Sequence, residues 1–182
     1  MKIKGKNISL LQMFCLTMYY CFLTYLPVST FPIIGKFSRK LRYLCCKHIF
    51  LYCGQNVNIE RKAIFGSGLL LRIDNNSGIG VKCVVPSDIQ IGKNVMMGPN
   101  CYILHANHEI DRTDIPMIDQ GHASIKQTII EDDVWIGRQV LFSPGRIVKK
   151  GSIVGAGCVL SKDFPEYSII GGNPSKLIRI RN

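Results

Sequence analysis

An apolar side chain returns at every sixth position through most of the chain beyond residue 72. Two runs follow this period, separated by an interruption. They comprise Ile73, Ile79, Val85, Ile91, Met97 and Ile103, and then Ile130, Ile136, Phe142, Val148, Val154 and Leu160. A period of six is neither the alternation of a half-buried strand nor the 3.6-residue turn of a helix.

A second inward position follows four residues after most of the bulky ones and is small or β-branched. It holds Ser77, Cys83, Val95, Cys101, Val134, Val140, Ser152 and Cys158. The residue directly after the bulky one is often glycine, namely Gly80, Gly92, Gly98, Gly137 and Gly155. Glycine there permits a positive φ or a close approach of two backbones. Each unit then supplies one short strand and one turn, three units close a triangular coil, and stacked coils form a parallel β-helix.

The repeat is predicted over residues 53–165, with an extruded loop at 109–127 and a tail at 166–182. A two-residue slip around Leu71 and Arg72 resets the phase of the first coils. The loop is charged and polar, and such loops on a rigid scaffold often carry function. Arg146 occupies a small inward position, so either the register shifts there or the Pro144-Gly145 turn points it outward.

Residues 1–52 are predicted to form a helical arm that is both apolar and basic. No charged residue occurs from Ile8 to Gly35, and polar side chains make residues 8–26 only moderately apolar. We favour a helix that lies on a membrane or packs on an oligomer over one that spans a bilayer. A secretory signal is a weaker alternative, because no small-residue cleavage site follows. Residues 38–52 predict a second, amphipathic helix that carries Arg39, Lys40, Arg42 and Lys47.

Positive charge is concentrated in the arm and its junction with the repeat. Residues 1–62 contain ten Lys or Arg and one acidic residue, Glu60, a balance of +9 out of a formal total of +11. The basic residues flank apolar segments without a base-stacking or groove-reading motif, which argues against nucleic acid as a partner. An anionic lipid surface is the better match, and lysines that merely solvate the arm are the alternative. We therefore expect a cytoplasmic protein, with peripheral contact at the cytoplasmic membrane face as an open prediction.

The eight cysteines predict free thiols in a reducing compartment. None forms a Cys-x-x-Cys pair, and several occupy the inward register of the repeat, where a thiol serves as a small apolar filler. We expect neither disulfides nor a structural metal.

Several segments together resemble the hexapeptide-repeat acyltransferases. Beside the ladder itself, they are Val134-Trp135-Ile136-Gly137, Gly155-Ala156-Gly157 with Ser161-Lys162-Asp163, and Gly172-Asn173-Pro174 with Lys176 and Arg179. The resemblance covers residues 53–182 and is nearest to the maltose and galactoside O-acetyltransferases and their capsule or lipopolysaccharide relatives. It implies a left-handed β-helix, an exception to the right-handed crossover rule. It also implies a homotrimer with acetyl-CoA between neighbouring prisms.

The family places a catalytic histidine at the end of a coil just before an extruded loop, and His108 matches that position. Transfer of an acetyl group from a thioester to a hydroxyl needs a base for the hydroxyl proton, and imidazole titrates near working pH. The same nitrogen can protonate the departing thiolate. Direct transfer needs no acyl-enzyme, which agrees with the lack of a Gly-x-Ser-x-Gly segment.

Other titratable residues near His108 have weaker claims. His105 is the main competitor for the base, whereas His122 and His48 are expected to be noncatalytic. Asp111, followed by Asp114, is the nearest carboxylate that could fix the imidazole tautomer, and a solvated loop charge is the alternative for each.

The resemblance also implies a set of cofactor-binding residues. Gly155, Ala156 and Gly157 would let a pantetheine arm approach backbone amides. Ser161 and Lys162 lie at a predicted turn near the cofactor, and Lys176 and Arg179 would supply cations for the nucleotide phosphates.

Some positions depart from the pattern of the family. Arg138 stands where relatives have a small residue in contact with CoA, and Trp135 is expected to pack or to form a wall. For the acceptor, the candidates are Asn76, Ser77 and Asn107, although the local sequence around Asn76 differs from the sugar acetyltransferases.

The leading hypothesis is acetyl-CoA-dependent O-acetylation of a sugar or glycan intermediate. N-acetylation of an amino sugar or small amine is the alternative that a histidine base serves equally well. A metal hydratase of the γ-carbonic anhydrase type would need His105, His108 and His122 as zinc ligands. A nonenzymatic β-helix scaffold is the third class.

Overall fold

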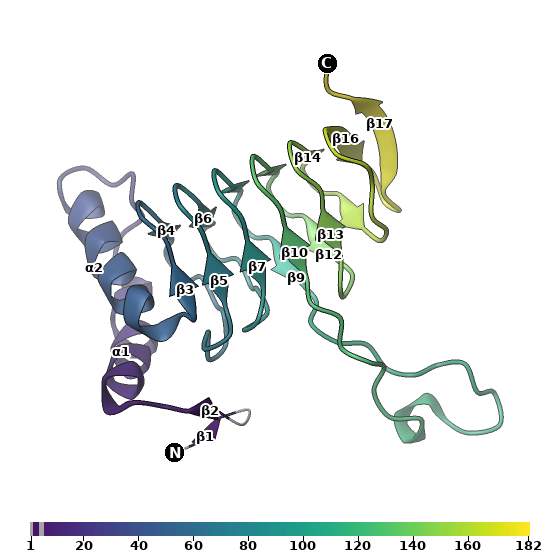
Figure 1. Cartoon of the computed structure of the whole chain (residues 1–182), viewed down its shortest axis with the longest axis horizontal. Coiled ribbons are helices and arrows are strands. Elements are labelled where there is room, and N and C mark those ends of the chain that lie inside the picture. Colours follow the sequence, from purple (N-terminus) through teal and green to yellow (C-terminus); the bar gives the residue numbers. More distant parts are fainter. Residues whose placement is uncertain (1, 4–5) are drawn as a thin grey trace.

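A triangular prism with a helical cap at one end makes up the molecule (Figure 1). The computed structural model describes residues 2–3 and 6–182. The cap lies at the N-terminal end, the tail closes the opposite end, and one long loop projects from the side of the prism. The predicted class, a mainly β left-handed parallel β-helix with an α-helical arm, is confirmed.

Three parallel sheets form the sides of the prism. The first sheet contains β3 (Tyr52–Cys53), β5 (Arg72–Ile73), β7 (Gln90–Ile91), β10 (Ile129–Ile130) and β13 (Ile147–Val148). The second contains β8 (Met96–Met97), β11 (Trp135–Ile136), β14 (Ile153–Val154), β16 (Ser168–Gly171) and β17 (Lys176–Ile180), and β4 (Asn58–Ile59) and β6 (Gly78–Ile79) continue the same side. The third contains β9 (Tyr102–Ile103), β12 (Leu141–Phe142) and β15 (Val159–Leu160). Only β17 of these strands runs antiparallel to its neighbour in the part of the prism described.

The strand register explains the period found in the sequence. Arg72 pairs with Gln90, and Ile129 pairs with Ile147, so each of these coils takes 18 residues, or three units of six. Tyr52 pairs with Arg72, so the first coil takes 20. The two extra residues are the predicted slip near Leu71.

The core of the prism is the predicted ladder. Every predicted bulky position is buried except Met97, which is partly buried, and every predicted small position is buried. Arg146 points outward, because its Nε donates to the Pro144 carbonyl and its Nη1 to the Ser161 carbonyl. The second of the two interpretations of this residue is therefore correct.

Glycines after the bulky positions are needed for close approach between coils. A Cβ on Gly98 would lie 2.7 Å from the Arg138 nitrogen, and one on Gly137 would lie 2.5 Å from the Ala156 nitrogen. The positive φ falls two residues later, three after the bulky residue, at Asn76, Lys82, Asn94, Asn100, Asp133, Gln139, Gly145, Gly151 and Gly157. Asparagine, aspartate and glycine tolerate this conformation best, which accounts for most of these residue types.

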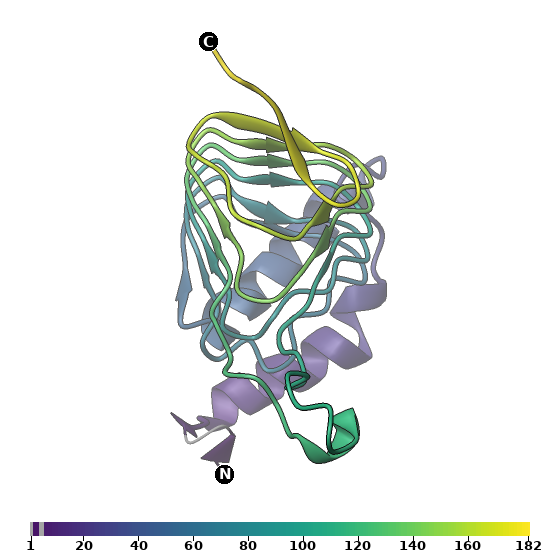
Figure 2. The ribbon, with the colours of Figure 1, turned by 90° about the vertical axis from the view of Figure 1, so that its right-hand side faces the viewer.

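The arm begins with a hairpin of β1 (Lys2–Ile3) and β2 (Lys6–Asn7) and continues with α1 (Leu10–Cys21), η1 (Leu23–Tyr25) and α2 (Ile34–Ile49). Ser9 and Gln12 form a capping box at the start of α1. The two helices pack on each other and lie across the far end of the prism when it is viewed from the C-terminal side (Figure 2). Within the described residues, neither helix has the length and apolar character needed to cross a bilayer.

Specific contacts hold this cap on the first coil. Tyr19 Oη donates to the Ala63 carbonyl at 2.8 Å, and the rings of Tyr19 and Phe50 both contact Phe65. Arg42, which we expected on the basic surface of the arm, is instead fully buried and donates from Nε to the Ile59 carbonyl at 2.6 Å. Its position on the inner face of α2, beside Glu60 at 3.6 Å, explains the difference.

Candidate active site

The loop that carries His108 leaves the prism after β9 and returns at β10 (Figure 1). Its stem is a short antiparallel ribbon. The Glu109 amide donates to the Gly121 carbonyl at 3.2 Å, and the Ala123 amide donates to the Asn107 carbonyl at 3.0 Å. A single 3-10 turn, η2 (Met117–Asp119), lies at the distal end. This pairing fixes the backbone on both sides of His108.

His108 is exposed and rests against a second imidazole. The backbones of His108 and His122 form a bridge, and their ring centroids are 4.7 Å apart with the planes tilted by 35°. The ring contact limits how far the His108 side chain can swing while its edge stays open to solvent. Such a group can accept a proton from a ligand that approaches from outside the chain.

Neither carboxylate predicted to orient His108 contacts it. Asp111 is exposed, and within the described residues no hydrogen bond or ion pair joins it to His108. Asp114 accepts from Arg112 Nε at 3.0 Å, and that hydrogen bond lowers the pKa of the Asp114 carboxyl. Asp114 is therefore tied to the loop itself.

A carboxylate that the sequence pattern did not reveal faces His105. The Asp88 Oδ1 atom lies 3.5 Å from His105 Nδ1, and this oxygen is buried without a hydrogen bond inside the described chain. The side-chain Nε2 of Gln127 donates to the main-chain carbonyl of Asp88, and Gln90 Nε2 donates to Gln127 Oε1 at 2.9 Å. Asp88, Gln90 and Gln127 thereby link the start and the end of the loop to the coil below it.

A groove of about 390 Å³ lies on a corner of the prism, where the chain passes from the second to the third sheet. Its lining consists of Gly98, Pro99, Trp135, Gly137, Arg138, Ile153, Val154, Gly155 and Ala156. Three of the predicted cofactor residues, Arg138, Gly155 and Ala156, meet here. Trp135 is half exposed and forms a wall, while the glycines keep the floor flat.

Two of the remaining predicted cofactor residues, Lys176 and Arg179, lie on β17, beyond the groove along the second sheet. The Gly155 amide donates to the Ile170 carbonyl of the next strand, and Lys176 pairs with Gly171 one strand further. Lys176 is therefore two strands, or about 10 Å, from Gly155. Arg179 pairs with Ile169 and lies further along the sheet.

Ser161 and Lys162 belong to the corner that follows β15. The Ser161 amide donates to Ser175 Oγ at 3.1 Å, directly before Lys176, so this corner joins the base of β17. The Lys162 ammonium lies 5.6 Å from the centre of the Phe164 ring. Gly157 lies between the groove and this corner, and a Cβ there would meet no atom within 4 Å.

The acceptor candidates separate into exposed and buried groups. Ser77 is buried, and its hydroxyl is already engaged within the prism, where it donates to the Gly92 carbonyl at 2.6 Å. Asn76 is exposed and forms a ladder with Asn56 and Asn94, beside a hollow of about 270 Å³ that Arg39 also lines. The Asn107 side chain is exposed on the loop stem.

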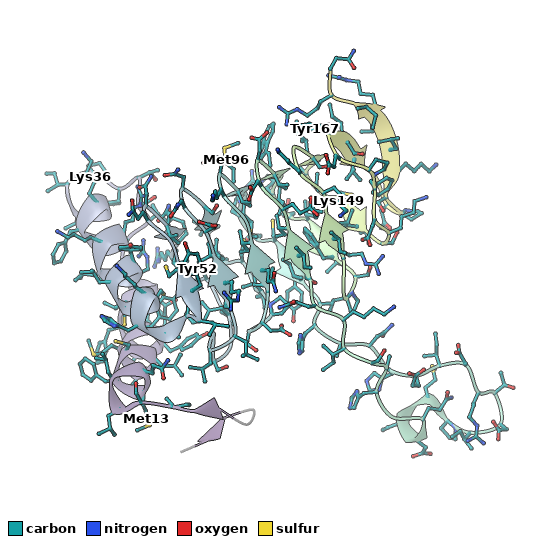
Figure 3. The ribbon with its side chains drawn as sticks, viewed as in Figure 1. Met13, Lys36, Tyr52, Met96, Lys149 and Tyr167 are labelled. Atoms are coloured by element: carbon teal, nitrogen blue, oxygen red, sulfur yellow. The ribbon has the colours of Figure 1, made fainter. Side chains whose placement is uncertain are left out.

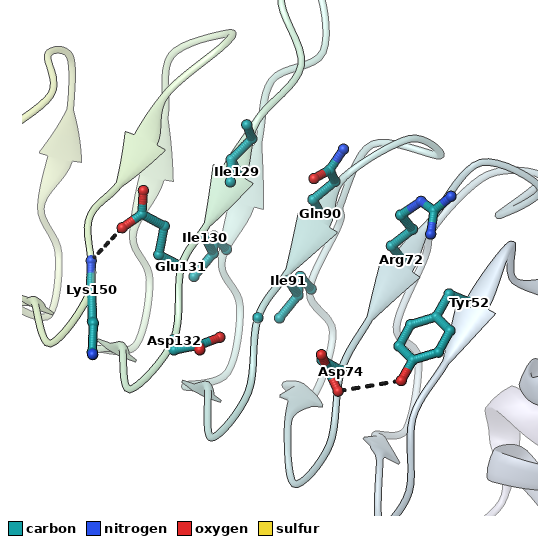
Figure 4. A pocket seen from close by; sticks show the side chains of 11 residues that line it. Tyr52, Arg72, Asp74, Gln90, Ile91, Ile129, Ile130, Glu131, Asp132 and Lys150 are labelled. Carbon is teal, nitrogen blue, oxygen red and sulfur yellow. Dashed lines mark hydrogen bonds between the residues drawn. The ribbon is translucent and has the colours of Figure 1, made fainter.

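A larger hollow of about 510 Å³ lies over the first sheet (Figure 4). Arg72, Gln90 and Ile129 follow one another along its length, and the Tyr52 hydroxyl lies 3.5 Å from Asp74 Oδ1. At its other end the Lys150 amide donates to Glu131 at 2.9 Å. Sequence analysis did not single out these residues, because they occupy outward positions that the six-residue period does not constrain.

His108 and the groove lie at different corners of one chain. The loop emerges at the corner after the third sheet, whereas the groove occupies the corner before that sheet. Among residues 2–3 and 6–182, no three His, Cys, Asp or Glu side chains gather as metal ligands would.

Several characterised acetyltransferases are similar to this chain in sequence, in fold or in both. No family model matches it. The galactoside O-acetyltransferase of Lactococcus lactis is 31% identical over 142 residues, which cover 73% of this chain and 64% of that protein. The solved structure of a maltose O-acetyltransferase from Clostridium difficile superposes with a TM-score of 0.74 at 26% identity, covering 97% of this chain and 90% of that one. The chain is similar to the hexapeptide-repeat acyltransferases in both sequence and fold.

The predicted resemblance to this family and to its maltose and galactoside O-acetyltransferases is confirmed. A galactoside acetyltransferase solved in complex with coenzyme A also has a TM-score of 0.74, covering 94% of this chain and 81% of that one; at 23% identity it supports the fold alone. The chain spans less than two thirds of the length of the curated relatives it matches.

Proposed function

We propose that the chain is an acetyl-CoA-dependent O-acetyltransferase that acts on a hydroxyl group of a sugar or glycan intermediate. The observation that carries the proposal is the glycine-floored groove between Trp135 and Arg138, on a fold shared with O-acetyltransferases. A groove floored by glycine backbone lets an extended thioester lie close to the chain. The similarity to galactoside and maltose O-acetyltransferases supports a sugar acceptor.

The acyl donor would lie along the corner from Gly98 to Gly157. The small residues Gly155, Ala156 and Gly157 would let the pantetheine arm lie close to the backbone, and Arg138 would close one side. Lys176 and Arg179, with Ser161 and Lys162 at the next corner, would contact the nucleotide phosphates. Both β17 cations are exposed, so neither has to be withdrawn from a buried ion pair to bind.

The complete site would require two copies of the chain. Because the base and the groove occupy different corners, His108 of one chain would reach the groove of its neighbour in a cyclic trimer. The loop projects from the side of the prism, where a neighbouring chain would contact it (Figure 1). Asn107 on its stem would then be available to the acceptor, whereas Asn76 lies at the corner between the first and second sheets.

The transfer itself would proceed in one displacement. His108 takes the proton of the acceptor hydroxyl as that oxygen attacks the thioester carbonyl carbon, and the tetrahedral intermediate collapses with cleavage of the carbon–sulfur bond. The imidazolium then returns its proton to the thiolate. The products are the acetyl ester and free CoA, and the imidazole is neutral again.

An acetyl-CoA consumption screen tests this proposal. We would measure thiol release with free sugars, sugar nucleotides and amino sugars as acceptors, which also separates O- from N-acetylation. His108→Ala should lower the rate by about 10²- to 10⁴-fold, because a general base contributes that much, while CoA binding is retained.

His48→Ala is the matched control, because it removes an exposed imidazole from the arm. It should keep the parent rate. Equal rates for His108→Ala and the parent enzyme would remove His108 from the mechanism, and absence of turnover with every acceptor class would remove the proposed reaction.

A further inference from the structure

The outward side of the helical cap is apolar, although it faces away from the prism. We call it the arm face. Its exposed apolar residues are Leu10, Leu11, Phe14, Phe22, Phe31, Ile33, Ile34, Phe37 and Leu44. Leu10 is 82% exposed and Ile33 is 96% exposed, far beyond what a helix packed on a core requires. Large apolar side chains left exposed in this number mark an interaction site.

The second helix presents apolar side chains to solvent as well as to the prism. Its buried side carries Cys45, Cys46 and Ile49, and Arg42 donates from Nε to the Ile59 carbonyl beneath the helix. Its outer side carries Phe37 and Leu44 together with lysines. The contacts with the prism therefore hold the helix in place and still leave large apolar residues outside.

Ile33 is the most exposed residue of the arm face and has an unfavourable backbone conformation. It has φ of 62° at the start of α2. With ψ of −65° and the Ile34 amide donating to the Pro32 carbonyl at 2.7 Å, Ile33 is the centre of a γ-turn, which is strained for a residue with a Cβ. Glycine would relieve the strain at no cost to packing, since nothing covers the side chain. Because the isoleucine is both exposed and strained, we expect it to contact a binding partner and not to stabilise the fold.

Positive charge surrounds this surface without any acidic residue to balance it. No Asp or Glu occurs between residues 8 and 59. Lys36, Lys40 and Lys47 are exposed on α2, between and beside the apolar side chains. Lys36 and Met13 both lie at the helical end of the molecule, far from the extruded loop (Figure 3). The charge complements an anionic surface and would repel another basic one.

We propose that the arm face docks on a lipid bilayer that contains anionic headgroups. Phe31, Ile33 and Phe37 enter the boundary between headgroups and acyl chains, and the lysines of α2 contact lipid phosphates. The helices lie in this boundary and do not cross it. Because the cap is the end of the prism, docking leaves the groove on its side open (Figure 1). The inference stands independently of acetyl transfer.

Sedimentation of the whole chain with vesicles tests the docking surface. The chain should bind vesicles of phosphatidylcholine with about one third phosphatidylserine, bind phosphatidylcholine alone more weakly, and lose affinity as salt rises. Ile33→Asn should lower the affinity by about tenfold, because it removes one large apolar side chain from the boundary. The same variant should be about as stable as the parent, since the side chain it replaces is 96% exposed and packs on nothing. A structural role for Ile33 would predict a loss of stability.

Ile118→Asn is the matched control, because Ile118 is 82% exposed at the far end of the extruded loop. It should bind vesicles as the parent does. Equal binding by the parent and Ile33→Asn, or by anionic and neutral vesicles, would overturn the proposal. Dissociation of a parent oligomer by Ile33→Asn, measured by light scattering, would also overturn it, because the arm face would then cover a second copy.

Discussion

Asp88 and His105 show how a side chain can support His108 without touching the reacting groups. The Asp88 carboxylate lies 3.5 Å from His105, and Gln127 at the return of the loop donates to the Asp88 main chain. These contacts join both ends of the extruded loop to the coil that carries Asp88. We infer that Asp88 is a positioning residue, whose loss would let the stem of the loop move relative to the prism.

Asp88→Asn should therefore lower kcat by about tenfold, because the base would be less well oriented toward the acceptor hydroxyl. The Michaelis constant for acetyl-CoA should be nearly unchanged, because the donor groove is not altered. His105→Ala should have a similar effect, and the double variant should be no worse than either, since both changes break one contact. The measurement is steady-state kinetics of all three variants. Additive losses would show that the two residues act separately.

At the scale of elements, the junction between the arm and the first coil depends on one buried ion pair. Arg42 on α2 is fully buried, and Glu60 lies 3.6 Å away at the end of β4. Burial alone would raise the pKa of Glu60, but hydrogen bonds from Ser29, Asn58 and the Arg61 amide outweigh it and lower that pKa below its usual 4.5. The stabilisation by the carboxylate is thus complete above pH 4.5 and is lost as the pH falls through the folded-state pKa.

Glu60→Gln should lower the free energy of unfolding by about 3 kcal/mol at pH 7, because it leaves the Arg42 charge buried without a counter-ion. The difference from the parent should shrink as the pH falls through the lowered folded-state pKa of Glu60, because the parent then becomes protonated too. Denaturant unfolding at a series of pH values from 7 into the acid range measures this change. Glu131→Gln, which breaks an exposed pair with Lys149, is the control and should cost under about 1 kcal/mol.

These elements differ in how far the sequence predicts them. The ladder of coils could be read directly, down to the slip before Ile73, because every inward position obeys one spacing rule. Arg42 could not be placed, because a basic residue in an amphipathic helix usually faces solvent and its partner Glu60 belongs to another element. Likewise, Asp88 and His105 meet only because consecutive coils stack, and a pattern along one coil does not record which outward side chains face each other.

At the scale of the whole molecule, the separation of His108 from the groove predicts that two inactive variants can restore each other. His108→Ala removes the base, and Ala156→Trp fills the groove at an exposed position, so neither should disturb the prism. Each should be inactive alone. When the two are co-expressed and assemble at random in a ring, a site is intact only where an unmodified loop meets an unmodified groove, which happens at about one quarter of the interfaces.

Activity near one quarter of the parent value in the mixed preparation would therefore demonstrate a site shared between neighbouring chains. Preparations of each variant purified separately and mixed without subunit exchange provide the control and should stay inactive. If base and groove met within one chain, every chain in the mixture would lack one of them, and co-expression would recover no activity at all. Recovery of activity would thus show that the base and the groove of one site come from two chains, and absence of recovery would show that they come from the same chain.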